Sequence, residues 1–306
     1  MSKIKVNGID IEYDSFGNSE AQAVLLISGL GTQMIRWNET FCQLLAEQGY
    51  RVIRFDNRDT GLSTHFDGAS MPDLAAISGA VARGETPDVP YTLFDMANDA
   101  VGLLDALMIE RAHVAGRSMG GMIAQVLASE HPERVLSLVS IMSSTGNRDL
   151  PGASPAVMAK MTSPAPHPLK DQQGYLAHCV AFSQVIAGRG YPFDESAQRD
   201  QALAEVKRAY NPSGFWRQLA AIAATGDLRP RLANITAPTL VLHGSDDPLV
   251  PPECGRDTAA HIAGAELSIV EGMGHDLPPS LFGFVAGAIA DNARRTTNPV
   301  NRPDVA

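Results

Sequence analysis

Short runs of apolar residues alternate with longer stretches of helical periodicity along most of the 306-residue chain. Such runs are typical of strands buried on both faces, as in a parallel sheet. They cover residues 23–29, 51–56, 112–118, 136–144, 239–245 and 265–270. Apolar residues recur at helical spacing in segments 41–48, 93–107, 122–129, 257–262 and 281–290. This alternation predicts an α/β fold, with a mostly parallel, twisted sheet and helices on both faces.

The first sixteen residues follow a different pattern. Apolar and polar residues alternate on both sides of Asn7-Gly8. An Asn-Gly pair between alternating segments predicts a β-hairpin with a tight turn.

The alternation of strands and helices stops at about residue 146 and resumes at residue 239. Five prolines fall between Pro151 and Lys170, and helix-like segments without a buried strand follow. We interpret residues 146–225 as an inserted helical cap, or lid, and residues 1–145 and 226–292 as the α/β core. Residues 293–306 contain few apolar side chains and are predicted to form a disordered tail.

A candidate nucleophile lies where a predicted strand meets a predicted helix. Residues 116–120 read Gly-Arg-Ser-Met-Gly, which is the GxSxG pattern in the strand–turn–helix context it needs. Ser118 is expected on a strained turn above the sheet, and side chains larger than those of Gly116 and Gly120 would clash with the crossing helix. Because a serine hydroxyl is a weak nucleophile, it needs a base and an orienting carboxylate from elsewhere in the chain.

Two later loops contain such partners in the order Ser, acid, His that this fold uses. Residues 243–251 follow a buried strand and include Asp246 and Asp247, and residues 271–278 follow the next strand and include His275. Ligand chemistry in open α/β sheets lies at the carboxyl ends of the strands. We therefore expect Ser118, one of the two aspartates and His275 at one edge of the sheet.

These segments resemble the α/β-hydrolase superfamily over almost the whole chain, from residues 28–31 (SGLG) to 272–278 (GMGHDLP). The chain looks like a capped serine esterase. Residues 56–63 (DNRDTGLS) and 190–194 (GYPFD) are most similar to anthracycline methylesterases of the aclacinomycin type. In the family the acid stands three residues after a glycine and ahead of a proline, which selects Asp247 rather than Asp246.

The resemblance also implies an oxyanion hole made of two backbone N–H groups. One belongs to Met119, the residue after the nucleophile, and the other to Leu30 in the glycine-rich loop. Many relatives have histidine where this chain has Ser28. Residues expected near the pocket mouth could line an apolar acyl or alcohol site or simply fill the core. These are Met34, Trp37, Met142, Met158, Met161 and Trp216.

The implied activity is that of a serine carboxylic ester hydrolase, an esterase acting on small to medium, mainly apolar esters with water as the second substrate. Ser118, His275 and Asp247 would act through an acyl-enzyme. The triad leaves open a proline-iminopeptidase-like, perhydrolase, acyltransferase or carbon–carbon bond hydrolase activity. Carbon–carbon hydrolases usually have Asn where Arg117 stands. A non-catalytic ligand-binding protein of this fold is a remote alternative.

Composition narrows the remaining choices. With 24 Lys and Arg against 34 Asp and Glu, the net charge of −10 argues against nucleic acid as a partner. The three cysteines form no disulfide framework, and the histidines show no metal-ligand spacing, so no metal or cofactor is expected. No apolar run resembles a signal peptide or approaches the ~18 residues of a membrane helix. A cytoplasmic location with no membrane partner is therefore expected, and no oligomer is indicated.

Overall fold

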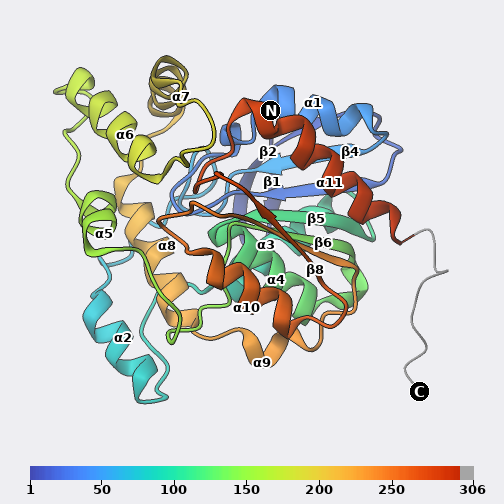
Figure 1. The fold of residues 1–306 in the computed structure, drawn as a ribbon. Coiled ribbons are helices and arrows are strands. Elements are labelled where there is room, and N and C mark those ends of the chain that lie inside the picture. The colour runs from blue at the N-terminus through green and yellow to red at the C-terminus, as the bar shows by residue number, and fades with distance from the viewer. Residues whose placement is uncertain (297–306) are drawn as a thin grey trace.

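The computed structural model describes residues 1–296, and its strands form one eight-stranded sheet in the order β1-β2-β4-β3-β5-β6-β7-β8 (Figure 1). Strands β1 and β2 are antiparallel, β2 is antiparallel to β4, and the remaining neighbours are parallel. The strands are β1 Ser2–Val6, β2 Ile9–Phe16, β3 Ala23–Ile27, β4 Arg51–Phe55, β5 Ala112–Arg117, β6 Val135–Ile141, β7 Thr239–Gly244 and β8 Glu266–Val270. The predicted α/β fold is confirmed.

The predicted hairpin is present at the N-terminus. Ile4 of β1 pairs with Ile11 of β2, and the chain reverses through Asn7 and Gly8. Both turn residues have positive φ, 46° and 78° respectively. A two-residue turn with two positive φ angles is the type whose twist matches the flanking strands, which explains the Asn-Gly pair.

Two layers of helices cover the sheet, and alternate strand residues face each layer. Leu25 and Ile27 of β3 pack in the core beneath α3 and α4, whereas Val24 and Leu26 pack beneath α1 and α11. The helices are α1 Glu39–Glu47, α3 Leu93–Ala106, α4 Met119–Glu130, α9 Arg229–Leu232, α10 Pro252–His261 and α11 Phe282–Arg294, with short 3₁₀ turns η1 Met34–Arg36, η2 Pro132–Arg134 and η3 Pro279–Leu281.

One predicted strand differs in its burial. The expectation that the run at 265–270 is buried on both faces is wrong, because Glu266 is exposed and Leu267 is 38% exposed. Strand β8 pairs only with β7 and stands at the edge of the sheet. An edge strand has a neighbour on one side only and is covered less completely.

Five helices follow β6 and precede β7, and the first four lie together beyond one end of the sheet, at the left of Figure 1. These four are α5 Pro155–Thr162, α6 Gln172–Ile186, α7 Glu195–Arg208 and α8 Pro212–Thr225. We call them the α5–α8 segment. An additional helix, α2 Leu74–Ala82, packs against α8.

The C-terminal helix α11 continues to Arg294, two residues past the predicted end of the core. Ala293, which we had assigned to the tail, is buried in the core beneath α1 and α11. Residues 297–306 of the predicted tail lie outside the described residues. Among residues 1–296, no helix combines the length and the apolar character needed to cross a membrane.

Candidate active site

Ser118 occupies a sharp turn between β5 and α4. Its φ and ψ are 54° and −125°, a region that residues with a side chain rarely adopt. The turn is held because the Ser118 N–H donates to the Ile141 carbonyl at 2.9 Å. A Cβ on Gly116 would lie 2.0 Å from the Gly120 carbonyl oxygen, and one on Gly120 would lie 2.2 Å from that of Ile27. The glycines of the motif therefore permit the close approach of α4 to β5 and β3.

The structure brings Ser118, His275 and Asp247 together from the ends of β5, β8 and β7. His275 Nε2 lies 2.9 Å from Ser118 Oγ, and His275 Nδ1 lies 2.7 Å from Asp247 Oδ2. A carboxylate oxygen only accepts, so Nδ1 carries the ring proton and Nε2 is left to accept from the serine hydroxyl. This arrangement can move a proton from Ser118 to His275 while Asp247 stabilises the resulting imidazolium.

The Asp247 carboxylate is fully buried and is oriented by its own loop. Its second oxygen, Oδ1, accepts from the backbone N–H groups of Leu249 and Val250 at 2.9 and 2.8 Å. Asp246 instead accepts from the hydroxyl of Ser245 at 3.0 Å and has no contact with His275 of this kind. The geometry thus places Asp247, not Asp246, beside the histidine.

A second histidine lies behind this aspartate. His243 Nε2 is 2.8 Å from the carbonyl oxygen of Val250 and 3.6 Å from Asp247 Oδ2. Burial lowers the pKa of His243, which favours the neutral form of its ring. It therefore braces the loop of Asp247 without competing as a cation for the carboxylate that faces His275.

The loop that carries His275 is held by the α5–α8 segment. The His275 N–H donates to the carbonyl of Ile186 at the end of α6 at 2.8 Å, and the Gly190 N–H donates to the Gly272 carbonyl at 2.9 Å. A Cβ on Gly190 would lie 2.7 Å from the Gly272 Cα. The two backbones therefore pack directly against each other.

Two backbone N–H groups near Ser118 have no acceptor among the described residues. They belong to Leu30 and Met119. Met119 is the first residue of α4, where N–H groups have no partner within the helix and the positive end of the helix dipole lies. Both groups are free to donate to a substrate oxygen.

The predicted pocket residues divide by burial. Met34, Trp37 and Met142 are almost completely buried, and Trp37 and Met142 belong to the core beneath α1 and α11. Met158, on α5, is 38% exposed, whereas Met161 and Trp216 are half-buried. Contact of these six residues with substrate stays a prediction.

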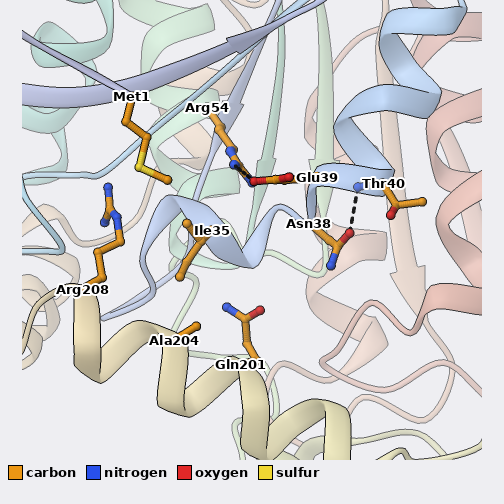
Figure 2. Close-up of a pocket in the computed structure, with 9 residues that line it drawn as sticks. All are labelled: Met1, Ile35, Asn38, Glu39, Thr40, Arg54, Gln201, Ala204 and Arg208. Atoms are coloured by element: carbon orange, nitrogen blue, oxygen red, sulfur yellow. Dashed lines mark hydrogen bonds and ion pairs between the residues drawn. The ribbon is translucent and has the colours of Figure 1, made fainter.

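A cavity of about 550 Å³ lies between α7 and the η1–α1 segment (Figure 2). Two arginines line it, and both are engaged by acids. Arg54 donates to Asp14 at 3.0 Å, and Arg208 pairs with the buried Asp56. The full lining is Met1, Ile35, Asn38, Glu39, Thr40, Arg54, Gln201, Ala204 and Arg208. This cavity therefore contains none of the residues of the Ser118 site.

Sequence reasoning missed the residues that tie α8 to the site. Asp59 receives two hydrogen bonds from Arg217, both of 2.7 Å, and both side chains are buried. Gln218, the next residue, accepts from the Gly31 N–H at 2.8 Å. One partner in these contacts, Asp59, lies in the recognisable RDTG segment, residues 58–61. Their partners on α8 lie in no recognisable motif.

The fold and the Ser118 site together define a class of protein. Residues 22–278 match the model of the alpha/beta hydrolase fold family, and the chain belongs to that family. Curated relatives include Rhodomycin D methylesterase DauP of Streptomyces sp. (strain C5), 28% identical over 93% of this chain and 95% of the relative. The similarity to anthracycline methylesterases predicted from residues 56–63 and 190–194 is thus confirmed.

Other relatives carry different names. Putative carbamate hydrolase RutD of Variovorax paradoxus (strain S110) is 31% identical over 87% of this chain and 89% of its own length. Among solved structures, the enol-lactonase from Burkholderia xenovorans LB400 superposes with a TM-score of 0.70 at 23% identity, covering 95% of this chain and 99% of that one. At that identity the structural match supports the fold alone.

Proposed function

We propose that this protein is a serine carboxylic ester hydrolase and that Ser118, His275 and Asp247 are its catalytic triad. One observation carries the proposal: two hydrogen bonds of 2.9 and 2.7 Å connect the Ser118 hydroxyl through His275 to Asp247. The names of relatives, which include methylesterases and an enol-lactonase, support ester chemistry.

The reaction begins with proton transfer. His275 Nε2 takes the proton of Ser118 as Oγ attacks the ester carbonyl carbon, and Asp247 stabilises the imidazolium. The negative charge that develops on the carbonyl oxygen is stabilised by the N–H groups of Leu30 and Met119. The imidazolium then protonates the leaving alcohol, which leaves an acyl group on Ser118. Water then attacks the acyl carbonyl carbon while His275 takes one of its protons. The bond from this carbon to Ser118 Oγ breaks, the carboxylic acid leaves, and the imidazolium returns the proton to Oγ.

The α5–α8 segment acts as the cap in this proposal. It contacts the loop of His275 through Ile186 and the loop of Leu30 through Gln218, so it is held against both sides of the site. The substrates proposed are small to medium, mainly apolar esters.

The decisive experiment combines covalent labelling with a substrate panel. A fluorophosphonate should react with Ser118 of the wild type, and Ser118→Ala should lose both labelling and hydrolysis of p-nitrophenyl esters. Ser19→Ala, an exposed serine far from the motif, is the matched control and should keep both. The panel spans p-nitrophenyl esters of rising acyl length, a methyl ester of an aromatic acid and an aminoacyl-proline-type amide. Faster turnover of the amide, or turnover by Ser118→Ala, would overturn the proposal.

A further inference from the structure

Gln218 joins three segments that meet at the proposed oxyanion hole. Its side chain is completely buried in the middle of α8. Its oxygen accepts from the Gly31 N–H at 2.8 Å, and its Nε2 donates at 2.7 Å both to the Arg58 carbonyl and to the Thr60 hydroxyl. Because both donors and the acceptor of the amide are used, the orientation of the Gln218 side chain is fixed.

The contact lies directly beside the Leu30 N–H. Residues 29–32 form a turn in which the Thr32 N–H donates to the Gly29 carbonyl at 3.3 Å. The Leu30 N–H belongs to the peptide between Gly29 and Leu30, and Gln218 binds the N–H of the next peptide. On the other side, the Asn57 side chain donates to the Ser28 carbonyl at 3.0 Å. The peptide that carries the Leu30 N–H is therefore held between two peptides that are each fixed by a side chain.

Helix α8 also fixes the shape of this turn. Gly31 has a φ of +64°, and a Cβ there would lie 3.0 Å from a ring carbon of Phe215. Phe215 and Gln218 are three residues apart and so lie on the same face of α8. One face of the helix thus supplies both the hydrogen-bond acceptor and the packing surface for Gly31.

We infer that Gln218 is a positioning residue that aims the Leu30 N–H at the substrate oxygen, so that the cap forms part of the oxyanion hole. This inference rests on the proposed function. Gln218 does not touch the reacting atoms, and it acts through the Gly31 peptide. Within residues 1–296 the Ser28 hydroxyl is buried without a hydrogen-bond partner, so this hydroxyl makes no hydrogen bond there that supports the loop.

The test is Gln218→Met, which keeps the volume but removes the acceptor for Gly31. Loss of one oxyanion donor typically lowers kcat by about 10²–10³-fold. Misalignment of a donor that is still present should have a smaller effect, on the order of 10–100-fold in kcat, with KM within about threefold. A trifluoromethyl ketone, whose adduct with Ser118 places an oxyanion in the same hole, should bind more weakly by the same factor as the loss in kcat/KM.

Two further variants separate positioning from general support of the fold. Thr60→Val removes one acceptor of Gln218 but leaves its bond to Gly31, and it should keep kcat within about threefold of the wild type. Gln218→Glu retains an oxygen for the Gly31 N–H and should recover part of the kcat lost in Gln218→Met. Should Gln218→Met fail to fold, Gln218→Leu, which also removes the acceptor for the Gly31 N–H, is compared with Gln218→Glu and Thr60→Val in its place.

The results of these variants decide whether Gln218 has a positioning role. Unchanged kcat in Gln218→Met, or an equal loss in Thr60→Val and Gln218→Met, would overturn the positioning role. The same holds if KM rises while binding of the ketone is unaffected. These results leave the esterase proposal intact provided that wild-type Ser118 reacts with the fluorophosphonate. Failure of wild-type Ser118 to react would overturn the esterase proposal together with this inference.

Discussion

Removing one partner of the buried ion pair between Asp59 and Arg217 should be strongly destabilising, and Arg217→Met tests this expectation. The two side chains are 0% and 2% exposed and share two hydrogen bonds of 2.7 Å. Removing the guanidinium would leave the Asp59 carboxylate buried, with the Tyr91 hydroxyl at 2.6 Å, the Phe66 N–H at 2.8 Å and the Asn211 side-chain amide at 3.4 Å as its remaining donors. Breaking one side of such a pair typically lowers the free energy of unfolding by about 3–5 kcal/mol, and we expect a loss in this range.

Urea denaturation followed by circular dichroism measures this loss. Arg83→Met is the matched control, because Arg83 forms a similar two-bond pair with Glu85 on the exposed surface, where such pairs contribute little. That variant should denature like the wild type. Adding Asp59→Asn to Arg217→Met removes the unpaired charge and should recover part of the stability. A loss below about 1 kcal/mol in Arg217→Met, the range of a surface pair, would refute the reasoning.

The same pair predicts a pH dependence. Burial acts to raise the pKa of Asp59, but the hydrogen bonds from Arg217 and Tyr91 outweigh it, and the net pKa lies below the usual value. A carboxylate whose pKa is lower in the folded state than in the unfolded chain contributes stability above its unfolded pKa of about 4. This contribution is lost as the pH falls through the folded-state pKa. In Arg217→Met, burial without the guanidinium raises the pKa of Asp59, so protonation relieves the unpaired charge in that variant first. The difference in unfolding free energy between wild type and Arg217→Met should therefore narrow as the pH falls toward about pH 4 and below it.

Three further predictions concern single sites. Asp247→Asn should lower kcat for p-nitrophenyl esters by about 10⁴-fold, because the wrong histidine tautomer is favoured, whereas Asp246→Asn should stay near the wild-type kcat; equal losses would contradict the assignment. Gly120→Ala places a Cβ 2.2 Å from a backbone oxygen and should reduce the free energy of unfolding, measured by urea denaturation, by at least about 1–3 kcal/mol. A Cβ on Gly152 would have no atom within 4 Å, so Gly152→Ala is the control and should leave this free energy unchanged. Gly287→Ala, also without close neighbours and inside α11, should raise the free energy of unfolding by about 0.5–1 kcal/mol, and a decrease would contradict this.

The sheet could be predicted because its strands have a simple pattern. Runs of apolar residues mark the buried parallel strands, and the Asn7-Gly8 turn marks the hairpin. The exposure of β8 could not be predicted, since it depends on which strand stands at the edge, and strand order is a property of the whole sheet. Helix α2 was missed because its sequence, LAAISGAVA, combines small apolar residues with a central glycine and lacks an amphipathic stripe. The side chain of Asp73 caps its start, and α8 packs against it.

The candidate site, like the fold, could be predicted only in part from the sequence. Ser118, Asp247 and His275 could be proposed because each follows a recognisable strand, and strand ends converge at one edge of the sheet. Arg217 and Gln218 carried no such signal. Their partners lie more than 150 residues away in the chain, and α8 contains no motif that specifies which of its faces meets the core.

The segments most similar to anthracycline methylesterases form internal contacts in this chain. Arg58 pairs with the buried Asp99, Asp59 with Arg217, and Gly190 with the backbone of Gly272. Each of these contacts fixes the position of a loop or of α8. In this chain these residues therefore hold the α5–α8 segment against the core, a structural role that does not depend on one particular substrate. It follows that the sequence similarity predicts the architecture around Ser118 more strongly than the alcohol or acyl group of the ester. The acyl-length and methyl-ester arms of the panel, rather than the motif, must identify the substrate.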